Sequence, residues 1–140
     1  MRYWDSSALI PLLVREADSD RMTALLREDP ALVTWWGSSV ECASAIARTE
    51  REGVLTPADA AAALARLRAV ANSWTEIPAV SLVREQTTRL LRLHPLRAGD
   101  ALQLAAAIVA SDFQPSSLEV ITLDSRLAIA AEREGFTVLA

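Results

Sequence analysis

The sequence predicts an α/β protein in which a short parallel sheet of four to five strands is flanked by helices on both faces. Short apolar segments alternate with segments of helical periodicity along all 140 residues, and two apolar segments end in Asp-Ser. The composition is 51% hydrophobic with only 4 Gly and 6 Pro, which is typical of one globular domain. Strands that alternate with helices in this way form parallel sheets with right-handed crossovers. We therefore expect 1–140 to be a single domain.

The first half of the chain is predicted to contain two strands and three helices. In order, these are a strand over 2–4, a helix that begins at Asp5, a helix over 18–29, a strand over 31–36 and a helix over 40–52. Asp5 precedes Ser-Ser and an apolar run, which is a helix start signal. Gly53 is expected to end the third helix, and Glu41 lies in the first turn of that helix.

The second half is predicted to contain four helices and two strands. In order, these are helices over 56–74, 80–93 and 101–110, a strand over 118–123, a helix from Asp124 to about Gly135 and a strand over 136–139. The first two of these helices are expected to form a projecting arm. The segment 101–110 is apolar nearly all round, which is typical of a helix buried on most sides, and Asp100 lies at its entrance.

The composition excludes several function classes. All 14 basic residues are arginine, so a Schiff-base lysine and the lysine of a phosphate-binding loop are excluded. The net charge of −4 argues against a protein that coats nucleic acid nonspecifically. Cys42 and His94 are the only residues of their types, so they supply neither an internal disulfide nor a structural zinc site. With no secretory signal and no long apolar stretch, we expect a cytoplasmic protein without membrane contact.

Four acidic residues stand where helices begin. Asp5 and Asp124 each follow a predicted strand, and Glu41 and Asp100 each lie at the start of a helix. The carboxyl ends of parallel strands share one edge of a sheet, so these acids are expected to meet there. Singly, each acid is explained as a helix cap or a partner of the helix dipole. Together, two carboxylates about 5 Å apart repel by roughly 3 kcal/mol, so a cluster requires protonation or a cation.

The ligand type indicates which cation. Carboxylate oxygens without paired His or Cys favour Mg²⁺ or Mn²⁺, which keep several waters and are completed by phosphate oxygens of a substrate. Such an ion activates water and orients it toward a phosphodiester. The expected reaction is hydrolytic cleavage of a phosphodiester bond.

Four segments resemble the ordered acidic motifs of PIN-domain ribonucleases, over nearly the whole chain. They are Tyr3-Trp4-Asp5-Ser6-Ser7-Ala8-Leu9, Ser39-Val40-Glu41, Arg97-Ala98-Gly99-Asp100-Ala101-Leu102-Gln103-Leu104-Ala105 and Ile121-Thr122-Leu123-Asp124. The short chain is similar to the VapC toxins of type II toxin–antitoxin pairs. The resemblance implies a PIN-like three-layer sandwich that cleaves RNA endonucleolytically, is held inactive by a cognate antitoxin and forms a homodimer.

The same resemblance implies roles for individual residues. Asp5, Glu41 and Asp100 would hold the principal Mg²⁺ or Mn²⁺, and Asp124 would support that ion or a second one. Ser7 and Thr122 match polar family positions that orient the acids.

Arg97 lies one helical turn before Asp100, and we expect it beside the substrate or a neighbouring acid. Trp35 and Trp36 either stack on unpaired bases or belong to the core or an interface. Two other functions remain open from the sequence. One is a non-catalytic α/β module for dimerisation or partner binding, whose acids are only caps. The other is a metal-dependent nuclease that acts on another nucleic acid.

Overall fold

A parallel sheet forms the centre of the protein. The computed structural model describes residues 1–139 and has five strands in the order β3-β2-β1-β4-β5. Every neighbouring pair is parallel. The strands are β1 (Arg2–Trp4), β2 (Leu32–Trp35), β3 (Thr75–Ile77), β4 (Glu119–Ile121) and β5 (Thr137–Leu139). The predicted α/β class is confirmed.

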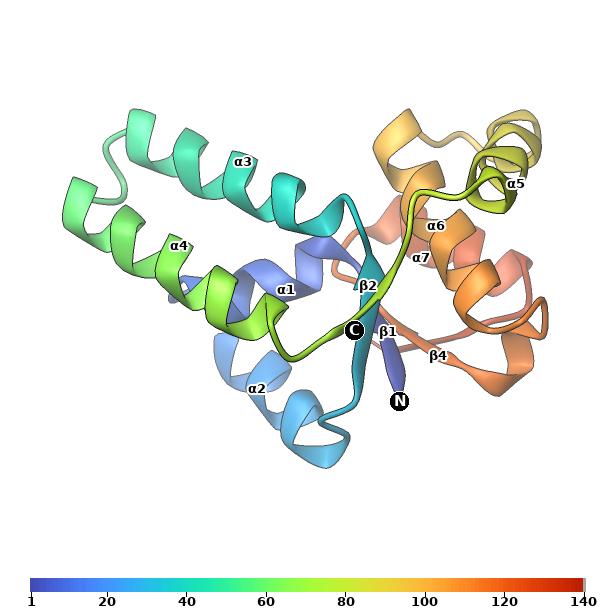
Figure 1. The fold of residues 1–140 in the computed structure, drawn as a ribbon, viewed down its shortest axis with the longest axis horizontal. Helices are drawn as coiled ribbons and strands as arrows, with labels where there is room; N and C mark the ends of the chain where they lie inside the picture. The colour runs from blue at the N-terminus through green and yellow to red at the C-terminus, as the bar shows by residue number, and fades with distance from the viewer. Residues whose placement is uncertain (140) are drawn as a thin grey trace.

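The helices form a layer on each face of the sheet (Figure 1). One layer contains α1 (Ser6–Leu13), α2 (Ser19–Glu28), α3 (Ser38–Arg51) and α4 (Pro57–Ala71), and the other contains α5 (Ser81–Leu93), α6 (Ala98–Ala110) and α7 (Ser125–Arg133). Each layer packs its own apolar core against the sheet. Because successive strand residues face opposite sides, Tyr3 belongs to the core under α5–α7 and Trp4 to the core under α1–α4. The chain is therefore a three-layer sandwich.

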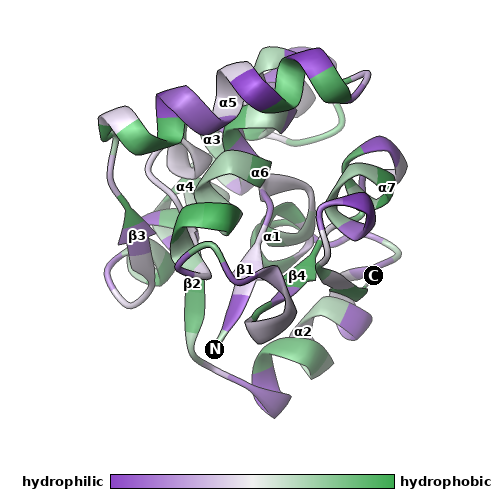
Figure 2. Ribbon diagram, turned by 90° about the vertical axis from the view of Figure 1, so that its right-hand side faces the viewer, coloured by the Kyte–Doolittle hydropathy of each residue, from purple (hydrophilic) through white to green (hydrophobic). Residues whose placement is uncertain are grey.

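Hydropathy follows this layering. Figure 2 shows hydrophobic residues on β2 and β4 and a mixture of polar and apolar residues along α5. Helix α6 buries seven of its 13 residues, as its nearly uniform apolar composition predicts. Within residues 1–139, the structure contains no helix that is both long and apolar enough to cross a bilayer.

The predicted arm made of the helices at 56–74 and 80–93 is wrong. Helix α4 ends at Ala71 and packs against α3, whereas α5 packs against α6 on the other face of the sheet. Figure 1 shows α3 and α4 projecting together as a hairpin. Strand β3 separates α4 from α5 and pairs with β2 through Trp35 and Ile77. Because β3 is a three-residue edge strand that is mostly exposed, it has no alternating apolar pattern by which the sequence would indicate it.

Gly37 joins β2 to α3 and permits a close approach between backbone and side chain. A Cβ atom at Gly37 would lie 2.4 Å from Nε1 of Trp35, whose side chain is buried. The indole ring therefore occupies the space that any other residue at position 37 would need. This contact fixes the start of α3, the helix that carries Glu41.

We expect Gly37→Ala to lower the free energy of unfolding by about 1–3 kcal/mol, the usual cost of overpacking a core. Gly99→Ala is the matched control, because a Cβ at Gly99 would meet nothing within 4 Å beyond its chain neighbours and its own helix backbone, and alanine favours the helix there. Chemical denaturation of both variants measures the difference. Equal stability of Gly37→Ala and the native protein would contradict the constraint.

Candidate metal and nucleic-acid site

The site lies where the connections from the sheet diverge. β1 lies between β2 and β4, so the chain leaves β1 toward one edge and later returns to its other side. In open α/β sheets, ligands bind at such a switch point, beyond the carboxyl ends of the strands. Asp5 follows β1, and Asp124 comes shortly after β4, with Trp4 and Ile121 paired between the two strands. Glu41 and Asp100 lie in the first turns of α3 and α6.

Asp5 is buried and held by one of its oxygens. Its side chain caps α1, and Oδ2 accepts hydrogen bonds from the Ser7 backbone N–H at 3.3 Å, the Ser7 hydroxyl and the Thr122 hydroxyl at 2.8 Å. The Ser7 hydroxyl also accepts the Leu123 backbone N–H at 2.9 Å, which joins α1 to the chain that leaves β4. Oδ1 has only the Ser6 hydroxyl nearby, at 3.5 Å. Asp5 is thus fixed in orientation with Oδ1 nearly unengaged.

Glu41 is anchored through a buried glutamine. Oε1 of Glu41 accepts a hydrogen bond from Nε2 of Gln103 at 3.1 Å, and Oε2 accepts one from the Ser6 hydroxyl at 2.8 Å. Gln103 is fully buried, donates its second Nε2 hydrogen to the Ser38 hydroxyl at 3.0 Å and accepts from the Tyr3 hydroxyl at 2.6 Å. This chain of hydrogen bonds connects the carboxylate to β1, α3 and α6.

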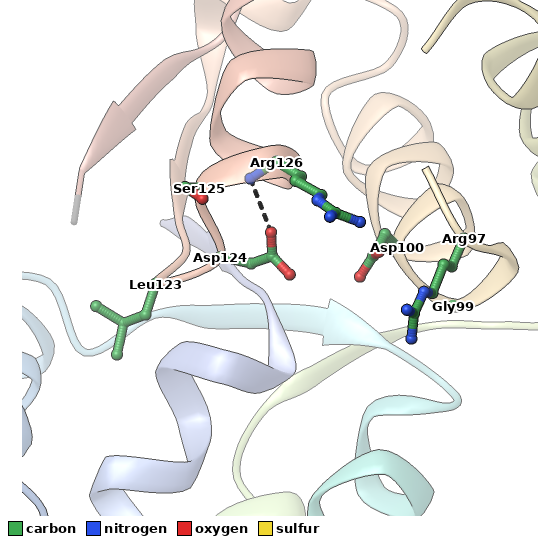
Figure 3. Close-up of a pocket in the computed structure, with 7 residues that line it drawn as sticks. All are labelled: Arg97, Gly99, Asp100, Leu123, Asp124, Ser125 and Arg126. Carbon is green, nitrogen blue, oxygen red and sulfur yellow. Dashed lines mark hydrogen bonds between the residues drawn. The ribbon is translucent and has the colours of Figure 1, made fainter. Parts of the chain in front are cut away.

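Asp100 and Asp124 open on a hollow of about 670 Å³ (Figure 3). Its lining residues are Arg97, Gly99, Asp100, Leu123, Asp124, Ser125 and Arg126. Oδ1 of Asp124 caps α7 by accepting the backbone N–H groups of Arg126 at 2.9 Å and Leu127 at 3.1 Å. Figure 3 shows the two carboxylates facing one another across the hollow. Asp124 therefore acts as a cap with one oxygen and keeps the other available.

Glu41 lines a second hollow of about 440 Å³ between α1 and α3, together with Ser6, Ser7 and Arg48. Three of the four acids are therefore distributed over two openings at the same edge of the sheet. Asp5 lies between these openings, because Ser7 lines one of them and Leu123, bonded to Ser7, lines the other.

The acids act on one another electrostatically. Burial raises the pKa of Asp5, hydrogen bonds from Ser7 and Thr122 lower it, and the charge of Asp100 raises it further. Burial also raises the pKa of Asp100, as does the nearby charge of Asp124, whereas the positive charges of Arg97 and Arg126 oppose the rise.

Glu41 belongs to the same electrostatic group. Burial raises its pKa, hydrogen bonds from Ser6 and Gln103 oppose that rise, and the charges of Asp5 and Asp100 add to it. Three of the four carboxyl groups thus resist ionisation, which is the situation that a nearby cation relieves.

The donor chemistry fits Mg²⁺ or Mn²⁺. The four groups supply only oxygen ligands, and Asp5 and Asp124 each keep one oxygen largely free of hydrogen bonds. In the side-chain positions described for residues 1–139, no three Asp, Glu, His or Cys groups converge closely enough to enclose an ion together. The acids are therefore coupled without forming a closed cage.

Of the other residues singled out from the sequence, one lies at the site and two lie in the core. Arg97 lines the same hollow as Asp100, as expected. Trp35 is a core residue, whereas Trp36 is 55% exposed. Cys42 is buried, and burial raises the pKa of its thiol to about 12, so it serves as a small core residue.

Three residues of the site have roles that were not predicted from the sequence: Ser6, Gln103 and Arg126. A signal for Gln103 was present, because it is the only polar residue in the apolar run 101–110. Ser6 and Arg126 lie beside helix caps, where polar residues are common, so nothing in the sequence sets them apart from ordinary residues near a cap.

We expect Asp100→Asn to raise the melting temperature of the metal-free protein at pH 7. A carboxyl whose pKa is raised by folding contributes stability below its unfolded pKa, and that contribution is lost as pH rises through the folded pKa. The contribution of Asp100 to the stability of the metal-free protein should therefore decrease as pH rises from about 4. In Asp100→Asn this loss should shrink, since the amide has no charge to bury.

Thermal unfolding in EDTA between pH 4 and 8 measures the effect. Asp59→Asn is the matched control, because Asp59 lies in the first turn of α4 and is exposed. This control should be no more stable than the native protein, since it loses a favourable helix-dipole interaction. A lower melting temperature for Asp100→Asn than for native protein at pH 7 would refute the electrostatic account.

We expect Gln103→Met to lower the free energy of unfolding by about 1–3 kcal/mol, because the Tyr3 and Ser38 hydroxyls lose a buried partner. Gln114→Met is the control, since Gln114 is exposed. Adding Tyr3→Phe should recover part of the loss by removing one orphaned hydroxyl. Urea denaturation measures five proteins: native, Gln103→Met, Tyr3→Phe, the double variant and Gln114→Met. Additive losses would rule out the link between Tyr3 and Gln103.

Comparisons with known proteins give a likeness of fold. No family model matches this chain, and no curated protein matches its sequence. Among solved structures, the chain is similar to a chain of a toxin–antitoxin complex from Klebsiella pneumoniae, with a TM-score of 0.66 and 17% sequence identity. The likeness covers 100% of this chain and 97% of that chain. The two chains therefore share one fold along their whole length.

Proposed function

We propose that this protein is a Mg²⁺- or Mn²⁺-dependent endoribonuclease and the toxin of a toxin–antitoxin pair. One observation carries the proposal. Four carboxyl groups, from Asp5 near one end of the chain to Asp124 near the other, lie at one edge of the sheet, and burial together with their charges raises the pKa values of Asp5, Glu41 and Asp100. Helix capping explains Asp5 and Asp124 singly, but it does not explain why repelling groups gather at a switch point.

Each acid has a distinct task in this proposal. Asp5, Glu41 and Asp100 would hold the principal ion, and Asp124 would support it. When bound, the ion supplies Lewis-acid chemistry that activates a water and offsets charge on the leaving oxygen. Ser7 and Thr122 hold one oxygen of Asp5 and so aim the other toward the site.

The hydrogen bonds around Glu41 serve the same purpose. Gln103 and Ser6 fix its two oxygens, so this carboxylate needs little reordering when a ligand arrives. Because the Glu41 side chain is already oriented, it would lose little conformational freedom when a phosphodiester and a water take their positions for attack.

Two observations support the substrate and the partner. The segment from Arg97 to Leu102 resembles the corresponding motif of PIN-domain ribonucleases, which supports RNA as the substrate. The fold is shared with a chain of a toxin–antitoxin complex, which supports a cognate antitoxin protein as the partner. A homodimer is part of the same proposal, by the resemblance to VapC toxins.

The test compares Asp5→Asn and Asp100→Asn with the native protein in RNA cleavage with added Mg²⁺. We expect both variants to lose at least about 100-fold in rate, because each removes a charged ligand and the metal supplies several kcal/mol of transition-state stabilisation. Asp59→Asn, which carries the same change in the first turn of a distant helix, should cleave at the native rate. Circular dichroism confirms that each variant is folded.

The two alternatives predict different results in the same assay. A non-catalytic interaction module would show no cleavage and no thermal stabilisation by Mn²⁺. A nuclease for another nucleic acid would cleave DNA strands in preference to RNA strands of the same sequence. Undiminished cleavage by folded Asp5→Asn and Asp100→Asn would end the proposal outright.

A further inference from the structure

The hollow beside Asp100 and Asp124 contains two arginines as well as two acids. Arg97 precedes the first residue of α6, and Arg126 lies in the first turn of α7. Figure 3 shows the Arg126 guanidinium directed toward the space between the acids and the Arg97 guanidinium on the opposite side of Asp100. The two cationic groups therefore flank the opening from different helices.

Neither guanidinium has a partner among the described residues. Both side chains are exposed, and neither makes an ion pair or a hydrogen bond within residues 1–139, although two carboxylates share their hollow. The charges of both arginines lower the pKa of Asp100, yet neither guanidinium makes a direct contact with an acid like the bidentate contact of Arg15 with Asp20. Their N–H donors therefore stay available to a ligand.

The start of α6 adds a second feature to this hollow. Arg97, the N-cap residue of α6, makes no side-chain cap hydrogen bond, whereas Asp124 caps α7. Asp100 is the acid in the first turn of α6, and its carboxyl group interacts with the Arg97 backbone N–H. Gly99 lies in the same turn and lines the hollow, and a Cβ on Gly99 would meet nothing within 4 Å beyond its chain neighbours and its own helix backbone. Backbone N–H groups at a helix start favour an anion, and here they lie beside two unpaired guanidinium groups.

A ligand that suits this hollow must carry negative charge toward the arginines and tolerate the acids. A phosphodiester is the better candidate, because its oxygens accept bidentate hydrogen bonds from guanidinium groups. A carboxylate ligand would accept the same hydrogen bonds, but a metal held by several acids is completed by phosphate oxygens. The planar donor fork of arginine also fixes the orientation of the phosphate, which a lysine would not.

We propose that Arg97 and Arg126 form a two-sided clamp for a single phosphate of the RNA strand, beside Asp100 and Asp124. The clamp rests on the proposed ribonuclease function, and it adds Arg126 as a positioning residue that orients the strand. Both arginines act on the same phosphate, so removing either one should abolish most of the contact made by the pair.

The experiment measures binding of a fluorescein-labelled, unstructured 12-nucleotide RNA in EDTA by anisotropy, over a range of salt concentrations. Gel electrophoresis checks that the strand stays intact. Each phosphate contact on a single strand contributes about 0.7 to the slope of log K against log salt concentration. We expect Arg126→Ala and Arg97→Ala each to reduce this slope by about 0.7 and to weaken binding about tenfold at low salt.

Two further variants separate a clamp from general charge attraction. Arg97→Ala combined with Arg126→Ala should lose little more than either change alone, because one phosphate is shared. Arg133→Ala is the matched control, since Arg133 lies at the other end of α7, and it should bind as the native protein does. Additive losses in the double variant, or an equal loss in Arg133→Ala, would overturn the clamp.

The outcomes also separate the clamp from the function on which it rests. If native protein binds and cleaves RNA while Arg97→Ala and Arg126→Ala bind with native affinity and slope, the clamp alone is wrong. If the arginine variants lose binding to a DNA strand that the native protein cleaves in preference to RNA, the clamp is right for a strand phosphate and the ribonuclease assignment is wrong. If native protein binds neither strand, both proposals fail.

Discussion

The burial and mutual repulsion of carboxyl groups form the constraint around which the site is organised. Burial disfavours the charged forms of Asp5, Glu41 and Asp100, and the neighbouring acids increase that penalty. Hydrogen bonds from Ser7, Thr122 and other groups offset part of it. A fold that keeps such groups together gives up some stability there, as functional sites often do.

The two sides of the site differ in rigidity. Asp5 and Glu41 are tied to buried hydroxyl and amide groups that reach into the sheet and α6. Asp100 and Asp124 instead border an open hollow with two unpaired arginines. The rigid side is suited to fixing ligand geometry, and the open side is suited to admitting a chain of phosphates.

The sequence predicted most of the fold because its main elements carry local signals. The Asp5 and Asp124 caps follow apolar strands directly, and both cap helices as expected. β3 was missed because a short exposed edge strand is defined by pairing with β2 and not by its own pattern. The pairing of α4 with α3 was missed for the same reason, since helix periodicity shows which face is apolar but not which neighbour covers it.

At the site, too, features with a local sequence signal could be predicted, and features that depend on contacts between distant elements could not. Four acids at helix starts could be placed on one edge from strand order, because the geometry of parallel sheets requires it. Asp100 and Asp124 line one opening and Glu41 lines another. This division depends on side-chain contacts between distant segments, so it has no local signal in the sequence. Gln103 stood out in an apolar helix, but its partners Tyr3 and Glu41 are known only once the layers are assembled.

The position of β1 has a consequence for biosynthesis. Among the five strands, β1 is synthesised first and lies in the middle of the sheet, and its neighbour β4 begins at residue 119. The aspartate after β1 cannot meet the one after β4 until synthesis has passed residue 124. A chain that is still growing before that point therefore lacks the assembled carboxylates, so the candidate site forms late in synthesis.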